Sequence, residues 1–464
     1  MEKKLLAGWP ISGKMHVDFS NEIGKIKAMH AVGQPPFGSS YRTFNFEPIN
    51  YLKDAHIPYS RLHDVGGVFA GNRFVDIPNI FRDFDADVDD PASYAFEFTD
   101  VLIEGIISHG VMPMFRLGVT IENQFNIRAF RIHPPKDFKK WAQICEHIIR
   151  HYNEGWANGF HYGIEYWEIW NEPDNGRYGM MENQMWTGTP EQYFELYDVT
   201  SKHLKACFGD KIKVGGYACT ALRGIYYHPE RYGVDVEPIE PNDRYLKFMS
   251  RMDFFFNFFK YIKEHNSPID YFTWHSYDNV EMTCEYARFI EKTMKEFGYD
   301  HIETHLNEWN NARERHLLGT SYASASAAAM MCAMHDTPTD VLCYYDARIT
   351  SGLYCGFFDP VRAIPWCTYY SFKAFGELYA LGKQVSCECD APDVYCLAAT
   401  DGEKKAILVT NFSDTAKELT LDTNEELGVY IIDQHRYLVK TGTAKGKLNL
   451  GANQVALLKN YELL

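Results

Sequence analysis

The amino-acid sequence predicts an α/β fold: a closed (β/α)8 barrel of the TIM type with an accessory β-sandwich domain. Two observations predict it. Strand-like and helix-like segments alternate eight times between residues 25 and 384, and eight β/α units are the count of a closed parallel barrel. After residue 384 the pattern changes to short strands separated by turn signals, which is typical of an all-β domain.

The barrel elements follow one another in strict order. The expected strands span residues 25–32, 57–63, 111–117, 164–170, 212–217, 269–275, 302–307 and 341–345. Helical patterns occupy about 47–56, 92–109, 137–154, 190–207, 242–266, 281–297, 321–335 and 367–381, and several open on Pro, Asp or Thr, as helix N-termini do. We therefore expect the barrel to cover residues 25–384.

The all-β domain is expected over residues 385–464. A turn at Asp401-Gly402 separates two strand-like runs, 394–400 and 406–412. Apolar and polar residues also alternate around Met15–Phe19, ahead of the barrel. We expect one or more strands from residues 1–24 to complete the sandwich, because the tail alone makes a small core with an unpaired edge.

Charge and composition exclude several classes of partner. The chain has 46 Lys and Arg against 62 Asp and Glu, a net charge of −16, which should repel nucleic acid and anionic membranes. The longest charge-free run of small residues, 321–334, is shorter than the roughly 20 residues that cross a bilayer. The 11 cysteines show no metal-finger spacing, which favours reduced thiols, and the N-terminus is no convincing signal peptide. A protein with a neutral ligand is expected, cytoplasmic by default and secreted if a leader was removed.

Polar residues collect where the expected strands end. The fourth strand ends in Trp-Asn-Glu-Pro at 170–173, the seventh in Asn-Glu-Trp-Asn at 307–310, the sixth in Trp-His-Ser-Tyr at 274–277 and the second in Arg-Leu-His-Asp at 61–64. The active site of a parallel barrel lies at these carboxyl ends of its strands. We therefore expect one site that gathers all four segments.

Two glutamates dominate this expected site. Glu172 and Glu308 are 136 residues apart in the chain, but the fourth and seventh strands of a barrel can face each other across its mouth. Two opposed carboxylates are the apparatus of glycoside hydrolysis. Glu172 ends an aromatic strand beside an amide, where a raised pKa would suit a general acid.

These segments resemble glycoside hydrolase family 39, a family of β-xylosidases and α-L-iduronidases. The resemblance rests on Trp-Glu-Ile-Trp-Asn-Glu-Pro-Asp at 167–174, on 61–64 and on 307–310, and it extends over the barrel. It implies a retaining mechanism, with Glu172 as acid/base and Glu308 as nucleophile, and we expect no cofactor. A small-molecule carbohydrate is the implied partner.

Other residues receive supporting roles on this hypothesis. Asn171 is expected to donate to the sugar 2-hydroxyl, Tyr277 to hydrogen-bond Glu308, and Arg61 to pair with Glu168 inside the barrel. The remaining expected sugar contacts are His63, His275 and the aromatic residues Trp309, Phe357 and Trp366.

The expected substrate is a neutral sugar, with a β-xyloside first, cleaved by an exo-acting enzyme. An iduronidase must bind a sugar carboxylate, and Arg348 is the one obvious cation near the expected strand ends apart from Arg61, which is expected to point inward. The alternatives are an α-L-iduronide, another β-glycoside, or a carbohydrate-binding barrel without catalysis. No His-Glu-x-x-His motif or glycine-rich phosphate loop is present, so the sequence indicates neither a metal nor a nucleotide.

Overall fold

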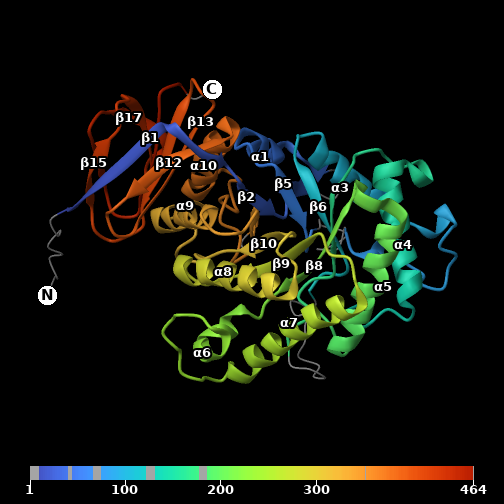
Figure 1. The fold of residues 1–464 in the computed structure, drawn as a ribbon. Coiled ribbons are helices and arrows are strands. Elements are labelled where there is room, and N and C mark those ends of the chain that lie inside the picture. The colour runs from blue at the N-terminus through green and yellow to red at the C-terminus, as the bar shows by residue number, and fades with distance from the viewer. Residues whose placement is uncertain are drawn as a thin grey trace, which may run out of the picture.

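The computed structural model describes residues 10–39, 44–65, 75–121, 131–176, 185–350 and 352–462. Over these ranges the chain forms a barrel with a β-sheet domain beside it (Figure 1). Within the same ranges, no helix combines the length and the apolar character needed to cross a membrane.

Eight parallel strands close the barrel, in the order β10-β11-β2-β5-β6-β7-β8-β9. Their bounds are β2 (Ala28–Gly33), β5 (Tyr59–Leu62), β6 (Met112–Leu117), β7 (Tyr166–Ile169), β8 (Lys213–Cys219), β9 (Tyr271–Ser276), β10 (Glu303–Trp309) and β11 (Val341–Tyr344). All eight predicted strands are present, so the predicted barrel is confirmed.

The helices surround the barrel. They are α1 (Asn50–Asp54), α2 (Ile77–Ile80), α3 (Glu97–Ile107), α4 (Phe138–Glu154), α5 (Pro190–Phe208), α6 (Pro229–Tyr232), α7 (Tyr245–His265), α8 (Val280–Phe297), α9 (Ser321–His335) and α10 (Cys367–Leu381). Short 3-10 turns are η1 (Glu47–Ile49), η2 (Pro91–Ser93), η3 (Trp156–Asn158), η4 (Gly209–Lys211) and η5 (Leu222–Tyr227). Side-chain caps fix several of the starts: Asp137 caps α4, Thr189 forms a capping box at α5, and Asn279 caps α8.

Successive side chains of each barrel strand point into two different environments, as β7 shows. Trp167 and Ile169 belong to the main apolar core, which lies between the barrel and its helices. Tyr166 packs in a small cluster of residues from several barrel strands, and Glu168 is bonded to Arg61. Because side chains alternate along a strand, the residues that precede the strand tips on the inner face can support a site at the barrel mouth.

The second domain is one nine-stranded, mostly antiparallel sheet, in the order β17-β16-β19-β14-β13-β12-β1-β15-β18. Its strands are β1 (Ile11–Lys25), β12 (Lys383–Cys389), β13 (Val394–Thr400), β14 (Lys405–Asn411), β15 (Lys417–Asp422), β16 (Leu427–Ile432), β17 (Tyr437–Ala444), β18 (Lys447–Leu450) and β19 (Gln454–Lys459). A separate two-stranded pair, β3 (Gly38–Ser39) and β4 (Phe44–Asn45), precedes α1.

The N-terminal strand β1 lies inside this sheet, between β12 and β15. It is antiparallel to β12 and parallel to β15. Met15 and Val17 share one apolar core with Leu419 of β15 and Val429 of β16. The two ends of the sheet therefore wrap around a common interior, as in a sandwich.

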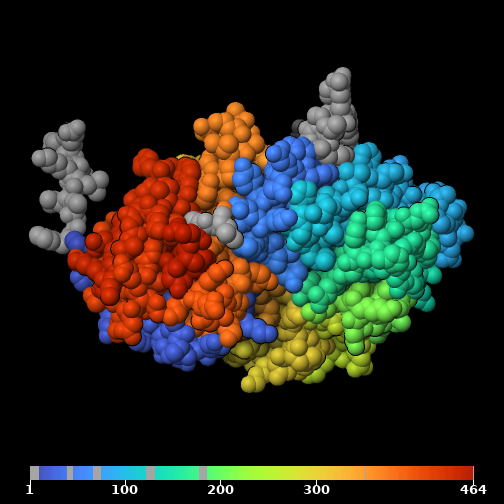
Figure 2. Space-filling view, turned by 90° about the horizontal axis from the view of Figure 1, so that it is seen from above, coloured from blue at the N-terminus to red at the C-terminus, as the bar shows by residue number. Residues whose placement is uncertain are grey.

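The two domains share one apolar core. Leu408 of β14 and Leu457 of β19 belong to the same buried cluster as the outer face of the barrel. Lys459 and Glu377 form an ion pair of 2.7 Å across this boundary, and the lysine is fully buried. In the space-filling view, the orange and red atoms of the sheet domain lie directly against the barrel (Figure 2).

Candidate active site

A cavity of about 590 Å³ lies at the carboxyl ends of the barrel strands. Its lining includes residues that follow or end five strands: His63 and Asp64 after β5, Asn171 and Glu172 after β7, His275 and Ser276 on β9, Glu308 on β10, and Tyr345 after β11. This is the end of a barrel at which active sites form.

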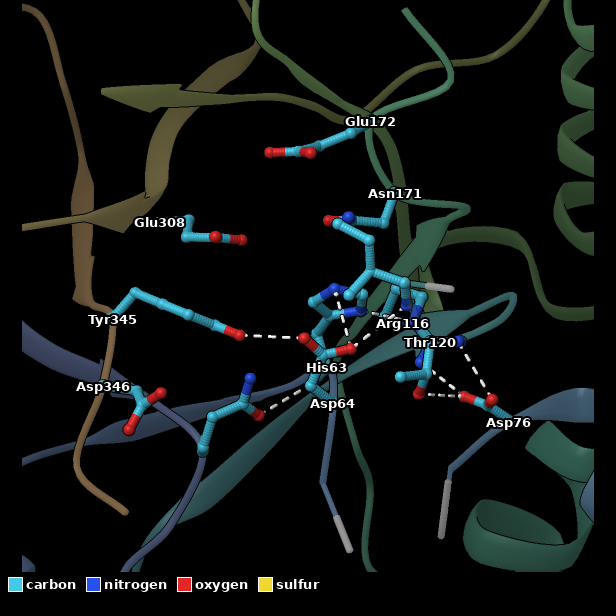
Figure 3. A network of polar contacts seen from close by, with 12 residues as sticks. His63, Asp64, Asp76, Arg116, Thr120, Asn171, Glu172, Glu308, Tyr345 and Asp346 are labelled. Atoms are coloured by element: carbon cyan, nitrogen blue, oxygen red, sulfur yellow. Dashed lines mark hydrogen bonds and ion pairs between the residues drawn. The ribbon is translucent and has the colours of Figure 1, made fainter. Parts of the chain in front are cut away.

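The backbone at the end of β7 turns Glu172 into the cavity. The N–H of Trp170 donates to the carbonyl of Leu117 at 2.7 Å, and its indole N–H donates to the carbonyl of Met185 at 2.8 Å. Trp170 and Glu172 both have positive φ values, 71° and 46°, which non-glycine residues rarely adopt. Figure 3 shows the carboxylates of Glu172 and Glu308 pointing into the same space.

Arg61 lies behind the residues that line the cavity and supports them from inside the barrel. Its Nε donates to Glu168 at 2.8 Å, Nη1 to Glu308 at 3.2 Å, and Nη2 to the side-chain oxygen of Asn171 at 2.6 Å. The other oxygen of Glu168 accepts from Asn307 at 2.6 Å. One buried cation thus fixes the orientation of both the amide and the carboxylate that face the cavity.

His275 lies between the two glutamates. Its Nδ1 is 2.7 Å from Oε1 of Glu172 and 3.4 Å from Oε2 of Glu308. Glu172 also accepts from the side-chain amide of Asn175 at 2.5 Å, and Tyr277 donates its hydroxyl to Glu308. The carboxylates are therefore coupled through a shared imidazole.

Burial and neighbouring charges shift the pKa values of this trio. Burial raises the pKa of Glu308 to about 6, against the opposing charges of His275 and Arg61. Burial acts in the same direction on Glu172, but the hydrogen bond and charge of His275 outweigh it and lower its pKa. Burial lowers the pKa of His275, but the charge of Glu308 and the contact with Glu172 leave it above its usual value. The sequence suggests a raised pKa for Glu172. In the structure the raised pKa belongs to Glu308 instead, because His275 lies closer to Glu172 and hydrogen-bonds it.

His63 and Asp64 form the wall opposite Glu172 (Figure 3). Arg116 donates its Nε to Nδ1 of His63 at 3.2 Å, so the proton of a neutral His63 sits on Nε2, which is 3.3 Å from Asp64. Burial and the charge of Arg116 hold the pKa of His63 well below its usual value. Asp64 also accepts from the hydroxyl of Tyr345 at 2.9 Å, and burial raises its pKa. This wall offers hydrogen-bonding groups for sugar hydroxyls.

The three predicted aromatic contacts do not line the cavity. Trp309 and Phe357 are fully buried, and both pack against Tyr344, at ring distances of 5.2 and 5.1 Å. Trp366 is half-buried at the start of α10, where its ring lies next to Gly319. The prediction is wrong for Trp309 because Glu308 faces the cavity, and strand alternation then turns the next side chain toward the helices.

The structure adds cations that the sequence analysis missed. The predicted cation, Arg348, is paired with Asp346 at 2.6 Å and is absent from the cavity lining. Five other cations line the cavity: Arg223, Arg244, Lys247, Arg251 and Arg313. They lie on η5, on α7 and its start, and after β10, and not at the strand tips. The spacing of 244, 247 and 251 on the predicted helix 242–266 was the available signal, because positions three and four apart share one helix face.

Two groups of side chains have the spacing of metal ligands among the described residues. One is the trio Glu172, His275 and Glu308, whose nearest donor atoms lie within 4.8 Å of one another. The charge of Arg61 beside Glu308 disfavours a cation there. The second group is Glu146, His203 and Cys207, half-buried on α4 and α5, where Arg150 is already bonded to the glutamate.

Known proteins resemble the chain in sequence and in fold. A family model described as "Glycosyl hydrolases family 39" matches residues 68–344. A β-xylosidase from Caldicellulosiruptor saccharolyticus is 22% identical over 345 residues, which cover 69% of this chain but only 64% of that protein, so the chain spans less than two thirds of this relative.

Solved structures resemble the whole fold. A glucosidase from Croceicoccus marinus has a TM-score of 0.75 at 18% identity, covering 97% of this chain and 99% of that one. A family 39 β-xylosidase from Caulobacter crescentus has a TM-score of 0.63 at 16% identity, covering 96% and 99%. The family model spans more than half of the chain, and its match includes both Glu172 and Glu308. The chain therefore belongs to glycoside hydrolase family 39.

Proposed function

We propose that the protein is a retaining, exo-acting β-glycosidase with β-xylosides as its first candidate substrates. The observation that carries the retaining mechanism is the closeness of Glu172 and Glu308: one oxygen of each lies within 4.8 Å of the other, and Nδ1 of His275 contacts both, at 2.7 and 3.4 Å. Inverting enzymes keep their two carboxyl groups about 6.5–9.5 Å apart to leave room for a water, whereas retaining enzymes keep them about 5–5.5 Å apart.

In the first step, ionised Glu308 attacks the anomeric carbon while Glu172 delivers a proton to the leaving oxygen. His275 supplies that proton: its Nδ1 is 2.7 Å from Oε1 of Glu172, so a proton carried by the imidazole can pass to the acid. In the second step, Glu172 removes a proton from water and passes it back to His275, while the water oxygen attacks the anomeric carbon and displaces Glu308. Arg61 and Tyr277 hold Glu308 in place for the attack.

Asn171 is the candidate donor to the sugar 2-hydroxyl. Arg61 occupies its side-chain oxygen, and its buried Nδ2 has no protein partner among the described residues. A substrate hydroxyl would satisfy this donor, and the bond would strengthen as positive charge develops on the ring. This geometry supports the role that the family resemblance implies for Asn171.

A neutral sugar suits the subsite between Glu308 and the wall formed by His63 and Asp64. A sugar carboxylate in this position would meet the carboxylate of Asp64, which disfavours an iduronide. The β-xylosidase relative from C. saccharolyticus supports a xyloside as the first candidate, and the glucosidase from C. marinus makes a β-glucoside the second.

A panel of aryl glycosides tests the substrate. We expect faster turnover of the aryl β-xyloside than of the β-glucoside or the α-L-iduronide. Faster cleavage of the iduronide would overturn the choice of a neutral sugar. If no glycoside is cleaved but a sugar raises the melting temperature, the chain is a binding protein and not an enzyme.

Azide rescue separates the roles of the two glutamates. Glu308→Ala lacks the nucleophile, so activity should fall by several orders of magnitude, and azide should give a glycosyl azide of inverted configuration. Glu172→Ala should still react with aryl glycosides that have acidic phenols, and azide should speed its turnover and yield the retained product. The opposite pattern would exchange the two roles, and an inverted wild-type product would exclude the retaining mechanism.

A further inference from the structure

One wall of the active-site cavity is cationic although the chain as a whole carries a net charge of −16. Arg244, Lys247 and Arg251 line the cavity from one face of α7 and its N-terminal boundary, and Arg223 of η5 lies beside them in the lining. Arg223 is neutralised by an ion pair with Asp278. Among the described residues, Arg244 and Lys247 take part in no ion pair.

Arg251 is built into this wall. It is only 7% exposed, donates from Nη1 to the carbonyl of Thr220 at 3.2 Å, and donates from Nη2 to the side-chain oxygen of Asn175. Its buried Nε has no protein partner within the described ranges. The charge of Asp174 acts on Arg251, but no ion pair between the two is formed, and the carboxylate of Asp174 accepts from Thr220. The guanidinium therefore retains an unused donor.

The three cations on α7 and at its N-terminal boundary repel one another. Burial and the charges of Arg251 and Arg244 lower the pKa of Lys247. Like charges three and four positions apart destabilise a helix, and the charges of Asp174 and Glu172 act against this repulsion, as a bound anion would also do. A half-buried lysine with two cationic neighbours attracts a negatively charged ligand.

The cationic wall lies on the side of the general acid. Asn175 joins the two, because its amide nitrogen donates to Glu172 at 2.5 Å and its oxygen accepts from Arg251. If Glu172 protonates the leaving oxygen, the leaving group departs past this residue, away from the sugar wall of His63 and Asp64. The ligand of the cations is then the leaving group and not the sugar that forms the glycosyl-enzyme.

We propose that Arg244, Lys247 and Arg251 bind an anionic group, a carboxylate or a sulfate, on the leaving group of the substrate. The enzyme would release a neutral sugar from an acidic partner, such as a uronic acid or a sulfated sugar. This inference rests on the proposed glycosidase function and on the role of Glu172 as acid.

The test compares three aryl glycosides of the sugar that the enzyme prefers. One carries the neutral 4-nitrophenyl group, and the other two carry in addition a carboxylate or a sulfonate on the ring. Since these substituents also change the acidity of the phenol, the measure is the ratio of kcat/KM between the wild type and Lys247→Gln for each substrate. We expect the variant to lose about threefold more on the anionic substrates than on the neutral one.

Lys260→Gln is the matched control, because Lys260 lies on the same helix with a side chain that is 67% exposed and is absent from the cavity lining. Its kcat/KM should stay at the wild-type value for all three substrates. For the wild type, the ratio of kcat/KM on each anionic substrate to kcat/KM on the neutral substrate should also fall between low salt and about 0.5 M salt. A larger loss on the carboxylate assigns a uronic acid, and a larger loss on the sulfonate assigns a sulfate.

Equal losses on all three substrates with Lys247→Gln would overturn the inference and leave the glycosidase function intact. If the wild type cleaves none of the three, the proposed function itself fails. The two failures are therefore distinguishable in one set of measurements.

Discussion

At the residue scale, the position of His275 decides how charge is shared between the two glutamates. It hydrogen-bonds Glu172 at 2.7 Å and lies 3.4 Å from Glu308, so it acts on the acid through a hydrogen bond and charge but on the nucleophile through charge alone. Glu308, whose pKa is raised to about 6, is protonated below that pH and cannot attack. Above the raised pKa of His275 the trio loses the proton that the acid needs. The rate should therefore have a bell-shaped dependence on pH.

Tyr277→Phe tests this explanation of the acidic limb of the pH profile, where the rate falls as Glu308 becomes protonated. The hydroxyl of Tyr277 donates to Glu308 and lowers its pKa, so its removal should raise that pKa above about 6. Activity should then be lost at a higher pH as the pH falls, with the largest loss of kcat/KM near pH 6 and the smallest near pH 8. The measurement is kcat/KM against pH for an aryl glycoside.

Tyr354→Phe serves as the control, because Tyr354 lines the same cavity and its ring packs 5.2 Å from Tyr277. Its acidic limb should stay where the wild type has it. A shift of the Tyr277→Phe limb to lower pH would contradict the assigned hydrogen bond.

Arg61→Met tests the buried cation that supports the site. The substitution leaves Glu168 buried without its cation, and removing one partner of a buried ion pair costs about 3–5 kcal/mol of unfolding free energy. We expect this loss in urea unfolding. Adding Glu168→Gln to the variant should recover part of it, because the uncompensated charge is then gone. A loss below about 1 kcal/mol would show that Arg61 does not balance the buried carboxylates.

At the element scale, the sequence predicts the barrel well because each strand has its own local signal. β7 and β10 end in the polar segments that hold Glu172 and Glu308, and the closed order of the sheet brings these two tips together. The prediction for Trp309 is wrong because side chains alternate between the two faces of a strand. The sequence places Trp309 near the site but does not show which face of the strand its side chain takes. Only the observation that Glu308 faces the cavity decides this.

The cationic wall was missed for a different reason. Its residues lie on η5 and on α7 and its start, in the long connection after β8, whereas the barrel pattern predicts site residues at the strand tips. The sequence shows that residues 244, 247 and 251 share a helix face. It does not show that this face is turned toward the cavity, because the packing of α7 depends on contacts with distant segments.

Deleting residues 1–20 tests the part that β1 plays. The deletion removes most of the strand between β12 and β15, which exposes two new edges and takes Met15 and Val17 out of the core. We expect a lower melting temperature and loss of soluble protein. Deleting residues 1–9 leaves β1 intact and should keep the wild-type melting temperature. Equal melting temperatures for both deletions would show that β1 is dispensable.

At the scale of the whole molecule, the two domains are joined by a common core. Along β14, Leu408 faces the cluster shared with the barrel, and Ile407 faces the interior of the sheet domain. The sheet is thus buried on both faces in this region, and neither domain can unfold without exposing apolar surface of the other. Separate melting of the two parts is not expected.

Calorimetry with two leucine variants tests this coupling. Leu408→Ala removes side-chain atoms from the shared core and Leu419→Ala removes them from the interior of the sheet domain, each at a cost of about 2–5 kcal/mol. If the molecule unfolds as one unit, the wild type shows a single transition, and both variants lower it together with the temperature at which activity is lost. A sheet domain that melts independently would instead give two transitions. Leu419→Ala would then lower only the transition of the sheet domain, while activity, which resides in the barrel, would persist to the wild-type temperature.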